Sequence, residues 1–228
     1  MKKLIIITGA NRGLGKALVD FVLKDEDATI VSLSRSIHED HKKISETKLV
    51  FIKTDLSEHF SNSIISIIDK KVTADSEILF FNNASLILPI GKIGSIKEVE
   101  IETSIKVNIE FPVNLINSLL NQFPKNKTKL VNIYSGAGNN PISFWSLYGA
   151  SKAYMKLFFR VLEEENKENA DISLYSIDPG VIDTGMQKHI RENAFPKQDY
   201  FIALKEGNKL IKPKDAAQRI FNEINYSL

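Results

Sequence analysis

Short apolar runs recur along the chain, and each is about six residues long and rich in β-branched side chains. A continuous run of this kind is typical of a strand that is buried on both faces of a sheet. Between the runs, apolar side chains recur three and four positions apart, which predicts amphipathic helices. The predicted strands are residues 3–8, 28–34, 48–53, 77–82, 129–135 and 172–178. The predicted helices are residues 14–25, 57–71, 98–123, 145–166 and 214–226.

Strands that alternate with helices predict right-handed crossovers and a parallel sheet covered on both faces. The fold class we predict is therefore α/β, a doubly wound, Rossmann-like parallel sheet of about six strands with helices on both faces. No linker or change of composition divides the chain, so we expect one domain over residues 1–228. Sheets of this class bind ligands at the carboxyl ends of their strands, where motifs that follow strands come together.

Composition narrows the classes of function. The formal net charge is +2 and the basic residues are scattered, so neither nucleic-acid nor membrane binding is expected. The chain has no cysteine, which excludes a disulfide framework and zinc–thiolate sites, and its four histidines lack the spacing of metal ligands. The apolar run at the start is too short for a signal peptide, and no segment approaches the ~20 apolar residues of a membrane span. We expect a cytoplasmic protein without a metal.

The segment T-G-A-N-R-G-L-G directly follows the first predicted strand and leads into a predicted helix. Glycines here allow a tight turn, close approach of the backbone to a pyrophosphate, and packing of the helix on the sheet. The free N–H groups at the helix N-terminus then face the phosphates. A plain glycine-rich turn is the alternative, but the position between strand and helix favours a nucleotide loop. The loop residues that we assign to the cofactor are Gly9, Asn11, Arg12, Gly13, Leu14 and Gly15.

Tyr148 and Lys152 are four residues apart on the predicted helix 145–166, so they lie on one face about a turn apart. A phenol ordinarily titrates near pH ~10. An ammonium at ~4 Å and an effective dielectric of ~20 would stabilise the phenolate by about 4 kcal/mol, or roughly three pK units. The pair could therefore make a tyrosine into a working acid–base group. Many ordinary helices carry the same spacing, so alone it is weak evidence.

The glycine spacing G-x-x-x-G-x-G resembles the fingerprint of the short-chain dehydrogenase/reductase family. Later segments resemble that family in order and in spacing, so that the resemblance covers nearly the whole chain. Those segments are Asp55-Leu56, Asn82-Asn83-Ala84, Asn108 in K-V-N-I-E, Ser135 thirteen residues before Tyr148, and Pro179-Gly180-Val181 with Thr184.

The resemblance implies a role for each of these residues. Tyr148 would be the general acid that protonates a carbonyl oxygen while hydride arrives from a nicotinamide. Lys152 would lower the tyrosine pKa and bind the nicotinamide ribose, and Ser135 would hydrogen-bond the substrate oxygen. Asn108 would support a water that links Lys152 to solvent. Asp55 would lie next to the adenine, and residues 179–184 would meet the nicotinamide. A buried tyrosine and a strand-end serine without catalytic roles are the structural alternatives.

The end of the second strand predicts which cofactor is bound. NAD-specific folds usually carry an acidic residue about 20 positions beyond the glycines. This chain has Arg35 and Ser36 there instead, and no carboxylate before Glu39. With Arg12, two guanidinium groups would suit the 2′-phosphate of NADP(H). The alternative is that both arginines are solvated surface residues.

Three further features resemble the sepiapterin reductase/benzil reductase branch. They are Trp145 three residues before the tyrosine, Asp183-Thr184 with Met186-Gln187, and the G-x-L segment at 207–210. The branch implies reduction of a ketone beside another carbonyl or imine-like carbon. The expected apolar wall of the substrate pocket, which could equally be core, is Leu86, Ile87, Phe144, Trp145 and Met186.

The chain departs from the branch at two places. Ser85 replaces the usual glycine after N-N-A, and we expect it to tighten a bend without touching the chemistry. An aspartate in a C-terminal tail, which anchors the pterin in sepiapterin reductases, has no counterpart before Leu228. A broad carbonyl reductase is therefore favoured over a pterin-specific enzyme.

Taken together, the sequence predicts an NADPH-dependent reductase of a small-molecule carbonyl substrate. The alternatives are an oxidative alcohol or hydroxysteroid dehydrogenase, which the two arginines disfavour, and a non-catalytic NADP-binding regulatory protein. Family members commonly pair through two helices, and tetrameric members add a seventh strand that this chain lacks, so we expect a homodimer. The apolar residues expected at its interface are Ile105, Ile109, Val113, Ile116, Met155, Phe158, Phe159 and Leu162.

Overall fold

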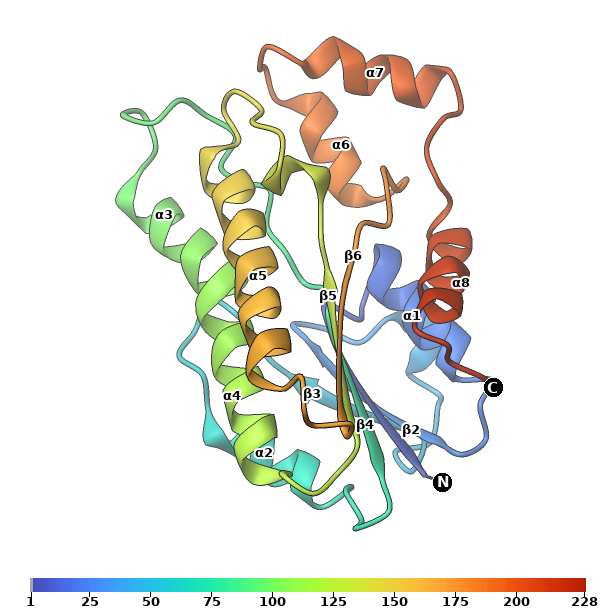
Figure 1. The fold of residues 1–228 in the computed structure, drawn as a ribbon. Coiled ribbons are helices and arrows are strands. Elements are labelled where there is room, and N and C mark those ends of the chain that lie inside the picture. The colour runs from blue at the N-terminus through green and yellow to red at the C-terminus, as the bar shows by residue number, and fades with distance from the viewer. Residues whose placement is uncertain (1) are drawn as a thin grey trace.

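Six short strands lie side by side in one parallel sheet in the computed structural model, which describes residues 2–228 (Figure 1). Their order is β3-β2-β1-β4-β5-β6, so the chain reverses its direction of winding between β1 and β4, the place where such sheets bind ligands. The predicted doubly wound, Rossmann-like fold is confirmed: three strands have the predicted boundaries, and the boundaries of the other three are shifted by one or two residues. The strands are β1 (Lys3–Thr8), β2 (Ala28–Ser34), β3 (Leu49–Lys53), β4 (Glu77–Asn82), β5 (Thr128–Ile133) and β6 (Ile172–Ile177).

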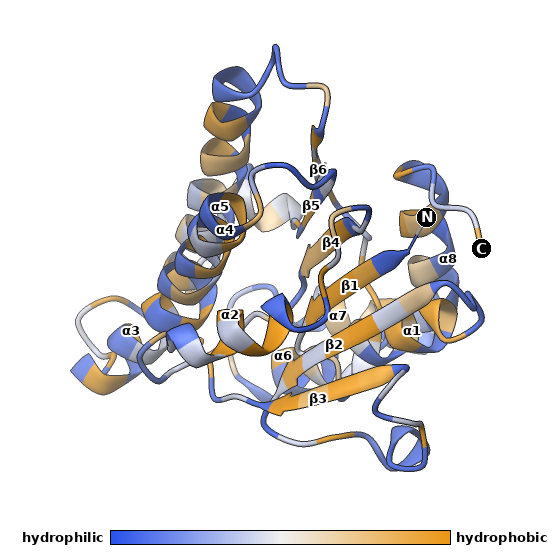
Figure 2. Cartoon of the chain, turned by 90° about the horizontal axis from the view of Figure 1, so that it is seen from below, coloured by the Kyte–Doolittle hydropathy of each residue, from blue (hydrophilic) through white to orange (hydrophobic). Residues whose placement is uncertain are grey.

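Alternate residues of each strand point to opposite faces, which gives the sheet two apolar layers. In β1, Ile5 and Ile7 pack with α1 and α8, whereas Leu4 and Ile6 face the opposite cluster with α2, α4 and α5. Figure 2 shows mostly hydrophobic strands between helices whose colours are mixed. These helices are α1 (Gly13–Val22), α2 (Asn62–Asp69), α4 (Phe111–Gln122), α5 (Ser146–Glu165) and α8 (Pro213–Glu223).

The predicted helix 98–123 contains an internal irregularity. It begins as α3 (Glu98–Ile105), passes through a π-helical turn at Lys106–Glu110, and continues as α4. A π-helical turn holds one more residue than an α-helical turn and is frequent at functional sites. The turn contains Asn108, which the sequence analysis assigned to the site.

Some helix predictions are wrong. Helix α2 begins at Asn62 and not at residue 57, because the Ser61 hydroxyl accepts a hydrogen bond from the Ser63 N–H and caps the helix. Helices α6 (Gly185–Glu192) and α7 (Gln198–Glu206) are not predicted at all. Both are short, with eight and nine residues, and only Gln187 and Ile190 of α6 and Phe201 of α7 are buried, so neither has the long run of apolar positions from which the other helices were predicted. They pack together above the sheet (Figure 1).

The predicted dimer face also needs correction. Ile116, Met155 and Phe159 are only 1, 2 and 2% exposed and belong to the core of the chain itself, because those positions face the sheet. Val113, Phe158 and Leu162 are half-buried against the same core. The apolar side chains that α3 and α5 do expose are Val99, Ile105, Tyr154, Leu157 and Val161. Within the described part of the chain, none of the helices combines the length and apolarity that crossing a bilayer requires.

Candidate active site

A cavity of about 1120 Å³ opens at the carboxyl ends of the strands. Loops that follow all six strands line it, together with α6 and α7. The residues predicted to bind the cofactor all line this one cavity, as do Ser135, Leu86, Ile87, Trp145 and Met186. The structure therefore brings together segments that are distant in the sequence.

The glycine loop lies where it could hold a pyrophosphate. Gly9 and Gly13 have φ angles of +66° and +55°, which L side chains rarely adopt. A Cβ on Gly15 would lie 2.1 Å from the Gly9 carbonyl oxygen, so only glycine fits there. No side chain caps the start of α1, which leaves the first N–H groups of that helix free for an anion.

Thr8 and Asn83 hold this loop against the end of β4. The Asn83 side-chain amide donates to the Thr8 carbonyl oxygen at 2.8 Å and to the Gly9 carbonyl oxygen at 3.4 Å. In the other direction, the backbone N–H groups of Asn83 and Ala84 donate to the Thr8 hydroxyl at 3.1 and 3.0 Å. Asn83 therefore acts on the predicted cofactor site by fixing the loop geometry.

Polar and charged groups gather at the end of the cavity that is formed by the glycine loop and the loops after β2 and β3. Arg12 and Arg35 are both exposed and both line it. The Asn11 amide donates to the Ser36 hydroxyl at 3.0 Å, which joins the glycine loop to the loop after β2. Hydrogen bonds from Ser57, with a smaller contribution from the Arg35 guanidinium, hold the pKa of Asp55 below its ordinary value. This end thus offers two cations and an ionised carboxylate.

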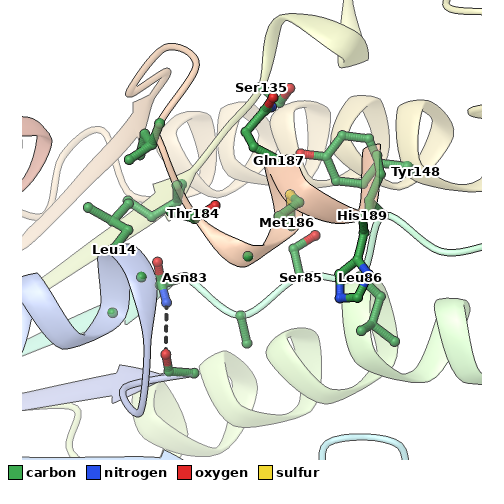
Figure 3. Close-up of a pocket in the computed structure, with 18 of the residues that line it drawn as sticks. Leu14, Asn83, Ser85, Leu86, Ser135, Tyr148, Thr184, Met186, Gln187 and His189 are labelled. Atoms are coloured by element: carbon green, nitrogen blue, oxygen red, sulfur yellow. Dashed lines mark hydrogen bonds between the residues drawn. The ribbon is translucent and has the colours of Figure 1, made fainter. Parts of the chain in front are cut away.

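Tyr148 and Lys152 lie one turn apart on α5, and each is only 7% exposed. The Lys152 ammonium lies 5.6 Å from the centroid of the Tyr148 ring and donates to the Ile133 carbonyl oxygen at 2.9 Å. Ser135 follows β5, and its hydroxyl accepts from the Ala137 N–H at 3.3 Å. Figure 3 shows the side chains of Ser135 and Tyr148 facing the same part of the cavity.

Burial sets the protonation of this pair. It raises the pKa of Tyr148 to about 12, and the Ser135 hydroxyl beside the phenol lowers it only in part. Burial also lowers the pKa of Lys152 to about 8. Burial is thus the main influence on the pKa of Tyr148 in this structure, with the Asp178 carboxylate also raising it, and the expected lowering by Lys152 stays a prediction. Tyr148 therefore stays protonated at neutral pH, the state that a proton donor needs.

Asn108 does not line the cavity. Its side-chain oxygen accepts from the Leu86 N–H at 2.8 Å and from the Ser85 hydroxyl at 3.1 Å, and its amide donates to the Leu86 carbonyl at 2.9 Å. The π-helical turn thus positions the Asn108 amide to hold the segment after β4. Ser85 belongs to the same network, since its hydroxyl bonds Asn108, and the expectation that it does not touch the chemistry stays a prediction. The predicted water near Asn108 stays a prediction.

The aromatic rings of Trp145 and Phe201 form part of the cavity wall. The Trp145 ring lies 5.5 Å from that of Phe195 and stacks at 5.2 Å on that of Phe201, which ties α7 to the start of α5. Phe144 was expected in the wall but does not line the cavity. Its φ of 73° is left-handed, and the ring packs against the cluster that contains Trp145.

Sequence reasoning missed several residues that line the cavity. Most come from the unpredicted helices and their flanks, and no apolar pattern marked them. Only Gln187 carried a signal, as part of the M-Q pair that resembles one branch of the family. The missed residues include Asn140, Ile142, Asp178, Gln187, His189, Ile190, Lys197, Tyr200 and Phe201. Among residues 2–228, no cluster of three or more His, Asp or Glu side chains could hold a metal ion.

Comparison with known proteins shows which family has this sequence pattern. The family model for short chain dehydrogenases matches residues 3–194. The chain belongs to the short-chain dehydrogenase/reductase family. A benzil reductase of the (S)-benzoin-forming type from Bacillus cereus is 33% identical, over 96% of this chain and 92% of that protein. Sepiapterin reductase from Xenopus tropicalis is 28% identical, over 96% and 90%. The predicted resemblance to this branch is confirmed.

Solved structures of the family have the same fold. The KRED1-Pglu enzyme superposes with a TM-score of 0.83 at 29% identity, over 95% of this chain and 92% of that one. ElxO with NADP bound gives a TM-score of 0.77 at 26% identity, over 97% and 90%. As a family member, this short-chain dehydrogenase/reductase is an oxidoreductase that acts on CH–OH and C=O groups with a nicotinamide cofactor.

The lowered pKa of Lys152 predicts a pH dependence of stability. The pKa of Lys152 is about 8 in the folded chain, against an ordinary value of 10.5. Between these two pH values Lys152 is therefore mostly neutral in the folded state and mostly protonated in the unfolded state. Stability therefore rises with pH in that window. Relative to Lys152→Met, the wild type should gain up to about 3 kcal/mol of unfolding free energy between pH 8 and 10.5, as measured by urea unfolding.

Met155→Ala is the matched control for this experiment, because it removes a buried apolar group from the same helix. Its stability difference from the wild type should not change with pH. A difference between wild type and Lys152→Met that is also constant would show that Lys152 keeps an ordinary pKa in the folded chain.

Proposed function

We propose that this protein is an NADPH-dependent carbonyl reductase of small ketones, with vicinal dicarbonyl compounds as its substrate class. One observation carries the proposal. The buried, protonated Tyr148 shares one cavity with Ser135 and Lys152. The same cavity is lined by Arg12, by Arg35 and by a loop whose backbone requires glycine.

The residues of the cavity fit a nicotinamide dinucleotide. The glycine loop and the uncapped start of α1 would hold the pyrophosphate, Lys152 the nicotinamide ribose, and residues 179–184 the nicotinamide. Thr184 lies close to the loop, because a Cβ on Gly13 would stand 3.1 Å from its methyl group. When bound, the cofactor supplies the hydride that reduces the carbonyl carbon.

The side chains supply the proton and hold the oxygen. Tyr148 donates its hydroxyl proton to the carbonyl oxygen, and Ser135 donates a hydrogen bond to the same atom as charge develops there. The phenolate that remains is stabilised by the Lys152 ammonium next to its ring, and a solvent proton restores it. Asn108 is a positioning residue that acts through Ser85 and Leu86.

Arg12 and Arg35 support NADPH over NADH. Arg12 of the glycine loop and Arg35 directly after β2 both line the cavity, and NAD-specific folds present a carboxylate near the end of β2. An anionic 2′-phosphate would pair with them through charge-assisted hydrogen bonds. Among solved structures of the same fold, ElxO contains NADP and 4-hydroxyisoleucine dehydrogenase contains NADH, so the two arginines carry this preference.

The names of the relatives and the wall of the cavity support the substrate class. Benzil reductase and sepiapterin reductase are both similar over most of the chain. Leu86, Trp145 and Met186 give the cavity an apolar wall that suits a ketone with an aryl or alkyl substituent. We further propose the cytoplasm as the compartment, which agrees with a chain that lacks cysteine.

A homodimer is also part of the proposal. Helices α3 and α5 contact each other and expose five apolar side chains on their outer surface, with Leu157 59% exposed. A two-fold axis through this surface would bury those side chains against their own copies. This outer set replaces the core residues that the sequence analysis assigned to the interface.

Tyr148→Phe should remove the proton donor while leaving the fold and cofactor binding intact. We expect kcat for reduction of 1-phenyl-1,2-propanedione to fall by about 10²-fold or more, with NADPH affinity nearly unchanged by fluorescence titration. Tyr154→Phe, an exposed tyrosine on the same helix, is the control and should keep full activity. Retention of more than about a tenth of kcat in Tyr148→Phe would exclude the acid–base role.

Arg35→Asp should weaken NADPH binding, because a carboxylate would repel the 2′-phosphate. The KM for NADPH is expected to rise about tenfold or more while the KM for NADH falls or stays constant. Lys125→Asp makes a similar change of charge at an exposed loop before β5, at the opposite end of the strands. An unchanged NADPH KM in Arg35→Asp would place Arg35 in solvent, outside the binding site.

Light scattering at micromolar concentration should give twice the chain mass of 25.7 kDa. Leu157→Glu should give the monomer, because a charge would be buried at the two-fold contact. Ile93→Glu alters an equally exposed apolar side chain on the loop before α3 and should stay dimeric. A monomeric or stably tetrameric wild type refutes the homodimer.

A further inference from the structure

His41 is a buried titratable side chain that has no role in the chemistry described above. It is 3% exposed, whereas every other residue of the β2–β3 loop, residues 35–48, is exposed or half-buried. A buried polar group normally has a hydrogen-bond partner, so the partner of this ring shows what the ring holds in place.

The partner is Asp20 on α1. His41 Nε2 donates to Asp20 Oδ1 at 2.8 Å, and Asp20 Oδ2 accepts from Lys16 Nζ at 2.7 Å. Lys16 Nζ also lies 3.0 Å from Asp40 Oδ2, which closes a ring of contacts between the loop and the helix. A 3₁₀ turn at Glu39–His41 places the two loop residues of this ring next to each other. The β2–β3 loop is therefore attached to α1 by side-chain hydrogen bonds and ion pairs.

Both sides of this attachment lead directly to the proposed cofactor site. On the helix, Lys16 directly follows Gly15 of the glycine loop. On the loop, Arg35 comes directly after β2 and lines the cavity, whereas residues 37–48 do not. From outside the cavity, the contacts of His41 thus join the segment proposed for the 2′-phosphate to the helix start proposed for the pyrophosphate.

We infer that His41 is a positioning residue for the cofactor, which holds the β2–β3 loop against α1 so that Arg35 is already in place for the 2′-phosphate of NADPH. This inference rests on the proposed NADPH preference and deepens it. Without the attachment the loop gains conformational freedom, and binding of the 2′-phosphate has to remove that freedom at a cost in affinity. NADH has no 2′-phosphate, so its affinity does not depend on this attachment.

A second cluster on the same helix shows what a purely structural role predicts. Asp25, just beyond the end of α1, accepts from the Tyr226 hydroxyl at 2.6 Å and from Lys3 Nζ at 2.7 Å. None of these three residues lines the cavity. Loss of a hydrogen bond in this cluster should lower stability without changing the preference between the two cofactors.

The test measures kcat and KM for NADPH and for NADH with 1-phenyl-1,2-propanedione, and stability by urea unfolding. His41→Phe keeps an aromatic ring and removes the hydrogen bond. His41→Gln places an amide N–H close to the position of Nε2, so it can still donate to Asp20. Asp20→Ala removes the acceptor instead, and the fold should tolerate this change because Asp20 is 44% exposed. Tyr226→Phe is the matched control.

In His41→Phe and in Asp20→Ala, the KM for NADPH should rise about fivefold relative to the KM for NADH, with kcat unchanged. His41→Gln should keep the wild-type ratio of the two KM values, and Tyr226→Phe should lose stability at the same ratio. An unchanged ratio in either of the first two variants, or an equal rise of both KM values, overturns the inference. If His41→Phe does not fold, Asp20→Ala decides alone.

Arg35→Ala tests whether His41 acts through Arg35. In that background His41→Phe should cause no further rise in the KM for NADPH, because the group that it positions is absent. The same rise in both backgrounds overturns the inference.

The wild-type arm separates this inference from the proposed function. A wild type that prefers NADPH, with the same KM ratio in His41→Phe, keeps the proposed function and removes the role of His41. A wild type whose KM is the same for NADPH and NADH refutes the proposed cofactor preference, and the inference falls with it.

Discussion

The close contact between the first turn of α1 and the loop after β1 is the constraint on which the site depends. At Gly15 the backbone approaches Gly9 so closely that no side chain fits. This approach places the helix start at the end of β1, next to β4, where the strand order reverses. The Asn83 amide lies in the same contact and bonds the carbonyls of Thr8 and Gly9. A nucleotide site therefore results from backbone packing before any charged group takes part.

Burial is the second determinant, and it acts on the pair that carries the chemistry. Considered on charge alone, a lysine beside a tyrosine favours the phenolate. Inside the protein, desolvation penalises both charged forms, which raises the pKa of the phenol and lowers that of the ammonium. The resting pair is thus a neutral acid next to a cation that can lose its charge near pH 8. This arrangement suits proton donation more than proton removal.

The sequence predicted the parts of the molecule that repeat a regular pattern. Buried parallel strands have continuous apolar runs, so all six were found, and the motifs at their carboxyl ends marked the cofactor loops. Helices α6 and α7 were not predicted, because few of their residues are buried. The residues that they contribute to the cavity were therefore not predicted either. Apolar spacing also could not tell which side of α5 faces the sheet, so Met155 and Phe159 were placed on the wrong face. The left-handed backbone of Phe144 had no signal, since it is not a glycine.

The π-helical turn at Lys106–Glu110 has a consequence for how one long helix can serve two neighbours. Each residue of an α-helix turns the chain by about 100°, so one additional residue in a turn shifts the phase of everything that follows. Before the turn, Val99 and Ile105 lie at the surface. After it, Leu115 and Leu119 are buried against the sheet. Loss of a single residue from the turn would therefore do more than displace Asn108. It would rotate the apolar stripe of α4 away from the sheet, which makes the length of this segment as restricted as its composition.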